Sequence, residues 1–208
     1  MSLNSETPPN NERSIVLVGL MGAGKTAIGK RLAAQLRLPF YDADQEIERA
    51  AGTTVAEIFR THGEAYFRAG EKRVIERLLA GGRIVLATGG GAFMDPDTRS
   101  LIKQRAISVW LRCPLPIILQ RVTGKSHRPL LNTGDPAETL RRLSEIRSPI
   151  YAQAAIIVDG TEDPPNVTTA NVISALAAYQ PPRRVPVTTS SGTYEVVIGN
   201  ELISRAGA

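Results

Sequence analysis

The sequence contains very little cysteine: Cys113 is the only one in 208 residues. A disulfide within the chain is therefore impossible, and a reducing compartment is the default expectation. The sequence also lacks a signal peptide and any apolar run of about 18 residues, the length that a membrane span requires. These absences predict a soluble, cytoplasmic protein without a membrane partner.

The features of nucleic-acid-binding proteins are missing as well. The net charge is only +5, and there is no block of consecutive basic residues with interleaved aromatics. The small basic excess fits either a site for polyanionic ligands or a mildly basic surface. A length of 208 residues suits one main domain with tails. We expect a disordered lead-in at 1–13, which is rich in Asn, Ser, Pro and Glu, a main domain at 14–180 and a tail at 181–208.

A glycine-rich turn at 19–24 lies between an apolar run at 14–18 and a helical pattern at 27–36, and it is followed by Lys25 and Thr26. This order is typical of the phosphate-binding loop, whose backbone N–H groups face an anion at a helix N-terminus. Lys25 would reach the outer phosphates, and the Thr26 hydroxyl would ligate Mg²⁺. The residues expected to bind the nucleotide here are Gly22, Ala23, Gly24, Lys25, Thr26 and Ala27. The sequence therefore predicts a nucleoside triphosphate site.

Strands alternate with helices along the rest of the main domain. We expect strands at 14–18, from 40, at 83–87, 106–111 and 155–158, and helices at 27–36, 45–51, 55–61, 64–79, 97–104, 114–121, 135–154 and 166–179. This pattern predicts an α/β fold of three layers, in which a parallel five-stranded sheet has helices on both faces. Ligands of such folds bind at the carboxyl ends of the strands.

Two carboxylates follow the second expected strand. Asp42 and Asp44 are two residues apart in an extended segment, so their side chains project to the same side. Asp42 is the best candidate for a metal role, through a water, because Mg²⁺ keeps much of its hydration shell. Asp44 would hold or deprotonate a second substrate, or cap a helix that starts at Gln45, or do both.

Three glycines, Gly89, Gly90 and Gly91, follow the third expected strand. They form either a simple turn or a place where a ligand approaches the backbone closely. Their position directly after a buried strand favours the ligand.

Two arginines are candidates for anion binding. Arg147 lies in the apolar sector of its expected helix, where an unpaired cation is costly. It should therefore meet an anion, either a ligand or an internal ion-pair partner. Arg68 has Glu71 one turn later as a partner, and by itself it would be a solvated charge.

The segment 123–134 is irregular in pattern and has the length of a mobile lid. It carries Arg128, which such a lid would bring to a transferring phosphoryl group. Arg121, on the last turn before this segment, would stack on adenine.

As a set, these motifs resemble the shikimate kinase family over about 14–179. The motifs are 19–26, 42–44, 63–68 with Glu71, 88–91, 128–131 and 147–151. The resemblance implies a P-loop kinase fold with a mobile lid and Mg²⁺ bound together with ATP. It also implies phosphorylation of the 3-hydroxyl of shikimate, a step that feeds the chorismate route to aromatic amino acids. We expect a monomer with shikimate and ATP as its partners.

The resemblance also implies roles for individual residues. Arg68 and Arg147 would bind the shikimate carboxylate, and Lys25 and Arg128 would neutralise the phosphoryl charge. The residues expected at the shikimate site are Asp44, Arg68, Gly89, Gly90, Gly91 and Arg147. The residues expected to be catalytic are Lys25, Asp44 and Arg128. Thr26 and Asp42 would bind the metal. Arg121, Arg128 and the loop after Asp159 would lie near ATP.

The tail departs from the family, whose members usually stop near Tyr179. Two β-rich runs around Ser191 and Gly192 predict a hairpin. This hairpin resembles the opening of 3-dehydroquinate synthase, so the chain is either the kinase part of a kinase–synthase fusion or a kinase with an ordinary tail. Family members also often carry a charged residue where this chain has Ala69. Two other functions stay open: another small-molecule kinase, such as a gluconate kinase, and a nucleotide-binding module without catalysis.

Overall fold

The computed structural model describes residues 13–122, 135–181, 183–189 and 192–198. Its centre is a sheet of five parallel strands in the order β2-β3-β1-β4-β5. The strands are β1 (Ser14–Val18), β2 (Phe40–Asp42), β3 (Val85–Ala87), β4 (Ala106–Arg112) and β5 (Ile156–Asp159). The expected parallel five-stranded sheet is confirmed.

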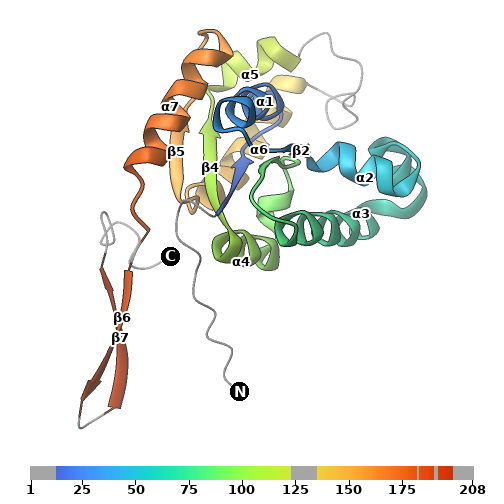
Figure 1. Ribbon diagram of the computed structural model, residues 1–208. Coiled ribbons are helices and arrows are strands. Elements are labelled where there is room, and N and C mark those ends of the chain that lie inside the picture. Colours follow the sequence, from blue (N-terminus) through green and yellow to red (C-terminus); the bar gives the residue numbers. More distant parts are fainter. Residues whose placement is uncertain (1–12, 123–134, 182, 190–191, 199–208) are drawn as a thin grey trace.

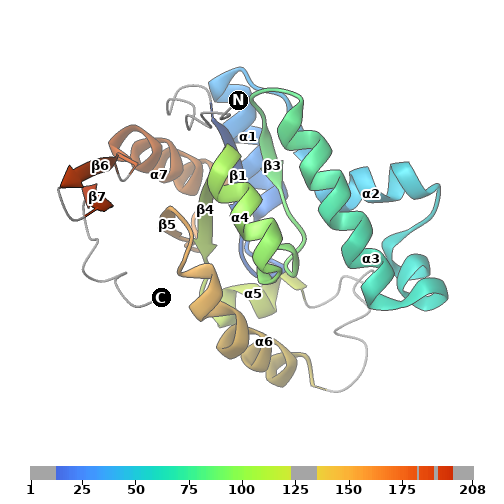
Figure 2. The ribbon, with the colours of Figure 1, turned by 90° about the horizontal axis from the view of Figure 1, so that it is seen from below.

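Helices cover both faces of this sheet (Figures 1 and 2). Helices α1 (Lys25–Leu36) and α7 (Pro165–Ala178) pack on one face. The other face is covered by α3 (Val55–Ala80), α4 (Pro96–Arg105), α5 (Leu115–Val122) and α6 (Pro136–Tyr151). The short α2 (Ala43–Ala51) follows β2 and packs on α3, and a 3₁₀ turn, η2 (Ala92–Met94), follows the glycines after β3. The expected three-layer α/β fold is thus confirmed.

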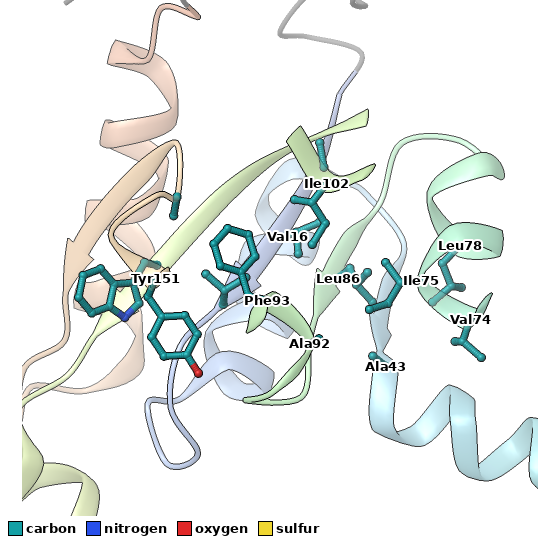
Figure 3. Packing of buried hydrophobic residues seen from close by; sticks show 14 of the residues in the cluster. Val16, Ala43, Val74, Ile75, Leu78, Leu86, Ala92, Phe93, Ile102 and Tyr151 are labelled. Carbon is teal, nitrogen blue, oxygen red and sulfur yellow. The ribbon is translucent and has the colours of Figure 1, made fainter. Parts of the chain in front are cut away.

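The alternation of side chains along β1 divides the core between the two faces of the sheet. Val16 and Val18 belong to the cluster beneath α3 to α6, whereas Ile15 and Leu17 belong to the cluster beneath α1 and α7. All four are buried. Figure 3 shows the first cluster, with Val16 and Leu86 of the sheet inside it. The strand that leads into the phosphate-binding loop is therefore held from both sides.

The strand register brings the carboxyl ends of the strands to one edge of the sheet. Asp42 at the end of β2 lies beside Ala87 at the end of β3, and Ala87 lies beside Leu17 of β1. The pairing of β4 with β5 ends at Arg112 and Asp159. Segments that leave these strand ends consequently meet along the same edge, where ligands of open α/β sheets bind.

Helix α3 replaces the two helices expected at 55–61 and 64–79. The two segments are joined at Gly63, whose φ of 78° and ψ of 175° are not helical. A positive φ of this kind is readily adopted only by glycine. The two expected helices are therefore present, separated by a kink rather than by a loop.

Arg13 belongs to the folded domain, although we expected it in the disordered lead-in. Its side chain is buried, and its guanidinium donates to the carbonyl oxygens of Lys103 and of Ala106, the latter at 2.7 Å. A cation at the carboxyl end of α4 is favourable because helix carbonyls there carry partial negative charge. The rest of the expected lead-in lies outside the described residues.

The tail forms an antiparallel hairpin of β6 (Arg183–Thr189) and β7 (Gly192–Ile198). In Figure 1 this hairpin stands apart from the five-stranded sheet, beyond the end of α7. Its turn lies outside the described residues. Within the described part of the chain, no helix is both long enough and apolar enough to cross a membrane.

Candidate active site

The segment between β1 and α1 forms a loop with the geometry of a phosphate cradle. Gly24 caps α1 with a φ of 94° and provides no side chain to its first N–H groups. Gly22 has a φ of 80°, and a Cβ there would lie 2.8 Å from Val122. These first N–H groups and the positive end of the α1 dipole therefore suit an anion. The Lys25 Nζ donates to the carbonyl oxygens of Gly19 and Leu20, at 2.8 Å each.

A cavity of about 1340 Å³ opens at this loop and extends over the carboxyl edge of the sheet. It connects the loop with the acidic end of β2, the glycines after β3 and the segment after β5. Of the expected site residues, the described ones that line it are Gly22, Ala23, Gly24, Lys25, Thr26, Ala27, Asp42, Asp44, Arg68, Gly89, Gly90, Gly91, Arg121 and Arg147. Arg128 and the expected lid at 123–134 lie outside the described residues.

Thr26 and Asp42 are in direct contact. The Thr26 hydroxyl donates to Asp42 Oδ2 at 2.7 Å, and the Asp44 N–H donates to the other oxygen of Asp42 at 3.1 Å. Asp42 is therefore the residue that caps α2, and the alternative in which Asp44 caps a helix from Gln45 is wrong. The physical reason is that α2 begins at Ala43, two residues earlier than expected.

The Asp44 carboxylate faces the cavity from the first turn of α2. A Cβ on Gly89 would lie 2.8 Å from Asp44 Oδ1 and 2.9 Å from Glu71 Oε1, so a side chain there would have to displace these two carboxylates. Burial raises the pKa of Asp44, and the charge of Asp42 raises it further, while Lys25 acts in the opposite direction. A desolvated carboxylate with a raised pKa is suited to accept a hydrogen bond or a proton from a substrate hydroxyl.

Arg68 is held by two glutamates on its own helix. Its Nη1 donates to Glu71 Oε2 at 2.6 Å, and its Nη2 donates to Glu64 Oε1 at 3.1 Å. The guanidinium lies directly against the backbone of Gly91, where a Cβ would collide with it. Glu71 itself is buried, and its Oε1 has no hydrogen-bond partner among the described residues. Burial raises the pKa of Glu71, and Arg68 opposes that shift.

Arg147 reaches the same glycines from α6. Its Nη1 donates to the carbonyl oxygen of Gly90 at 3.1 Å. No carboxylate of the described segments forms an ion pair with it, so the internal ion pair that we considered is not what holds Arg147. Its guanidinium lines the cavity, so a role in binding a ligand stays a prediction.

Two guanidinium groups and two backbone donors thus lie together beside the phosphate loop, and we refer to them as the candidate anion site. Neither the Gly90 N–H nor the Gly91 N–H has an acceptor in the part of the chain that the structure describes. Part of the cavity lining is apolar and comes from Val55, Phe59 and Phe67 of α3. From the sequence alone, these residues were not assigned to the site. The arrangement suits a small organic acid with a hydrocarbon face.

The far end of the cavity is bordered by Arg121 and the segment after β5. The Arg121 Nη2 donates to the carbonyl oxygen of Thr161 at 2.8 Å, and the Nη1 lies 3.6 Å from the Cys113 sulfur. The other residues at this end are Gly160, Glu162, Asp163, Pro164, Pro165 and Thr168. Arg121 therefore lines the cavity next to the segment after β5, and its stacking on adenine remains a prediction.

The pH dependence of catalysis is expected to respond to Glu48, which lines the cavity. The charge of Glu48 raises the pKa of Asp44, although less than burial and Asp42 do. Replacing Glu48 by Gln should lower the pKa of Asp44, so that Asp44 stays ionised to lower pH. We expect ionised Asp44 to be required for activity, so the fall of kcat at acidic pH should move to lower pH. The Gln carbonyl can still accept from the Val55 N–H, which Glu48 Oε1 accepts at 2.9 Å.

The measurement is a pH profile of kcat for wild type, Glu48→Gln and a control, Glu76→Gln, on the exposed face of α3. The control should reproduce the wild-type profile. An acidic limb of Glu48→Gln that stays in place, or moves to higher pH, would contradict the assignment of this limb to Asp44.

Comparison with known proteins gives the family of this chain. The family model described as "SKI: Shikimate kinase" matches residues 21–177. The shikimate kinase of Paramagnetospirillum magneticum is 54% identical over 167 residues, which cover 80% of this chain and 86% of that protein. The shikimate kinase of Bradyrhizobium diazoefficiens is 52% identical and covers 80% of this chain and 81% of its own length.

Solved structures of shikimate kinases have the same fold as this chain. The shikimate kinase of Acinetobacter baumannii in complex with shikimate superposes with a TM-score of 0.78 at 38% identity, over 80% of this chain and 93% of that one. A gluconokinase from Sinorhizobium meliloti has a TM-score of 0.53 at 18% identity, over 79% of this chain and 91% of that one, which shows only a shared fold. On the strength of the family model and the curated relatives, this chain belongs to the shikimate kinase family.

Proposed function

We propose that this chain transfers the γ-phosphoryl group of ATP to the 3-hydroxyl of shikimate and releases shikimate 3-phosphate and ADP. The observation that carries the proposal is the convergence of Arg68, Arg147 and the free N–H groups of Gly90 and Gly91 beside the phosphate loop. Paired guanidinium groups bind a carboxylate with defined geometry. The apolar lining from α3 offers a surface for the carbon face of a ring.

Asp44 would hold the hydroxyl that receives the phosphoryl group. Its carboxylate lies next to Gly89, between the candidate anion site and the phosphate loop. Transfer through a loose transition state needs little base catalysis, so orientation of the hydroxyl is as important as removal of its proton. Lys25 would neutralise charge on the transferring group, and Arg128 from the segment 123–134 would add a second cation.

Thr26 and Asp42 are the residues that would hold Mg²⁺. Their direct hydrogen bond joins a hydroxyl and a carboxylate oxygen at the base of the phosphate loop, and both are ligand types that Mg²⁺ prefers. The described residues contain no group of three or more acidic, histidine or cysteine side chains that could bind a metal. A metal held mainly by phosphate oxygens and waters fits such a sparse site. When bound, it would neutralise charge on the phosphates.

The substrate is tested by the release of ADP from ATP in the presence of shikimate, gluconate and nucleoside monophosphates in parallel. We expect turnover with shikimate at least about a hundredfold above that with gluconate, because a site built for one set of hydrogen bonds rejects substrates that leave them unpaired. Removal of Mg²⁺ with EDTA should abolish the reaction. Absence of turnover with shikimate would refute the proposal.

The hairpin lies outside the region matched by the family model, which ends at residue 177. Its interpretation as the opening of a 3-dehydroquinate synthase unit remains a prediction, as do a monomeric state and a cytoplasmic location. None of them alters the expected reaction.

A further inference from the structure

Tyr151, the last residue of α6, lies in the core directly behind the candidate anion site. Tyr151 is 1% exposed, and its ring centroid lies 5.8 Å from that of Trp110 and 6.5 Å from that of Phe93. Figure 3 shows Tyr151 and Phe93 in this cluster. From this position the Tyr151 hydroxyl donates to the carbonyl oxygen of Gly90. The sequence pattern assigns Tyr151 only to the apolar face of its helix, and packing alone would not require a hydroxyl there.

The Gly90 carbonyl oxygen is shared by two donors from one helix. Arg147 and Tyr151 are four residues apart, so they project from the same face of α6. The Arg147 Nη1 donates to this oxygen at 3.1 Å, beside the Tyr151 hydroxyl. Burial raises the pKa of Tyr151 to about 12, and the charge of Arg147 opposes that shift. The hydroxyl thus stays protonated and donating throughout the working pH range.

Two donors on one oxygen restrict the rotation of the peptide between Gly90 and Gly91. This peptide is trans, so its N–H, which belongs to Gly91, points opposite to the carbonyl held by α6. The phosphate loop is the neighbour on another side, because a Cβ on Gly90 would be in ordinary contact, at 3.6 Å, with both the Gly19 oxygen and the Met21 nitrogen. The direction of the Gly91 N–H and the place of the Arg147 guanidinium are therefore set by one shared acceptor.

We infer that Tyr151 is a positioning residue of the acid site, whose hydroxyl orients the Gly90–Gly91 peptide and Arg147 for the substrate carboxylate without touching the substrate. The inference rests on the proposed function, in which this carboxylate is that of shikimate. Glycine at 90 and 91 supplies no side chain that could restrict the peptide, and the restriction has to come from outside the turn. Tyr151 supplies it from α6.

Tyr151→Phe tests the inference because it removes one oxygen and keeps the ring between Trp110 and Phe93. We expect the KM for shikimate to rise about three- to tenfold, the range that one net hydrogen bond accounts for. The KM for ATP should stay within about twofold of wild type. A purely structural role of the hydroxyl would not separate the two substrates.

Tyr179→Phe is the matched control. The Tyr179 hydroxyl interacts with the buried Arg13 side chain, which contacts the carboxyl end of α4 rather than the cavity. Removal of that hydroxyl should lower the melting temperature and leave both KM values unchanged. If Tyr151→Phe behaves in the same way, Tyr151 contributes stability only and the inference is overturned.

A double variant provides the second measurement. Because Tyr151 and Arg147 share one acceptor, the shikimate KM of the variant that combines Tyr151→Phe with Arg147→Lys should rise by less than the product of the single effects. Independent, multiplicative effects would overturn the inference. If wild type itself gives no turnover with shikimate, the proposed function fails and the inference fails with it. An active wild type with an unchanged shikimate KM in Tyr151→Phe overturns the inference alone.

Discussion

Replacing Asp44 by Asn is expected to lower kcat by roughly a hundred- to ten-thousandfold, the range that a positioned acid–base group contributes. Asn keeps the size of the side chain but loses the negative charge and one of its acceptor oxygens. The substrate hydroxyl would then lack the desolvated carboxylate that orients it towards the phosphate loop. Since Asp42, and not Asp44, caps α2 and contacts Thr26, the helix and the metal residues should be unaffected.

The measurement combines kcat for shikimate phosphorylation with a titration of ATP binding. ATP should still bind the variant, because the cradle is formed by the backbone of the phosphate loop and by Lys25, whose Nζ donates to the carbonyl oxygens of Gly19 and Leu20. Asp97→Asn, which breaks an exposed ion pair with Lys72, is the control and should retain full activity. A kcat for Asp44→Asn within tenfold of wild type would exclude Asp44 from the catalytic role.

Replacing Arg147 by Ala is expected to raise the KM for shikimate about ten- to a hundredfold, which corresponds to roughly 1.5–3 kcal/mol for hydrogen bonds to a charged group. Arg147 is the cation of the acid site that has no ion-pair partner in the described part of the chain. Its loss therefore removes charge directly from the ligand. The KM for ATP should change less, because the Arg147 Nη1 donates to the Gly90 carbonyl, which lies next to the phosphate loop but is not part of it.

Arg141→Ala is the control on the same helix. Arg141 pairs with Glu138 and Glu145 on the exposed face of α6, so its removal takes away a cation without touching the cavity. Steady-state kinetics with each substrate varied in turn separate the two KM values. Equal rises for shikimate and ATP in Arg147→Ala would remove Arg147 from carboxylate binding.

The phosphate loop and the layered fold were predictable because their signals are local. Gly22, Gly24, Lys25 and Thr26 lie within one turn and helix start, and the alternation of strands and helices needs only neighbouring residues. Two details of the prediction are wrong, one for a local reason and one for a long-range reason. Asp44 was considered as a cap because the start of α2 was placed two residues too late, and Arg13 was placed in the lead-in because its acceptors are about ninety residues away.

By itself, the sequence determined that this chain is an α/β protein with a phosphate-binding loop, because backbone conformation and burial pattern follow from short-range residue order. Only the tertiary structure decided that Arg68 lies against Gly91 and that Arg147 and Tyr151 donate to the carbonyl oxygen of Gly90. The acceptor shared by Arg147 and Tyr151 is 57 residues from one and 61 from the other. Hydrogen bonds between residues so far apart in the sequence form only when the helices pack on the sheet. The spacing of residues within one helix cannot predict which distant residue accepts them.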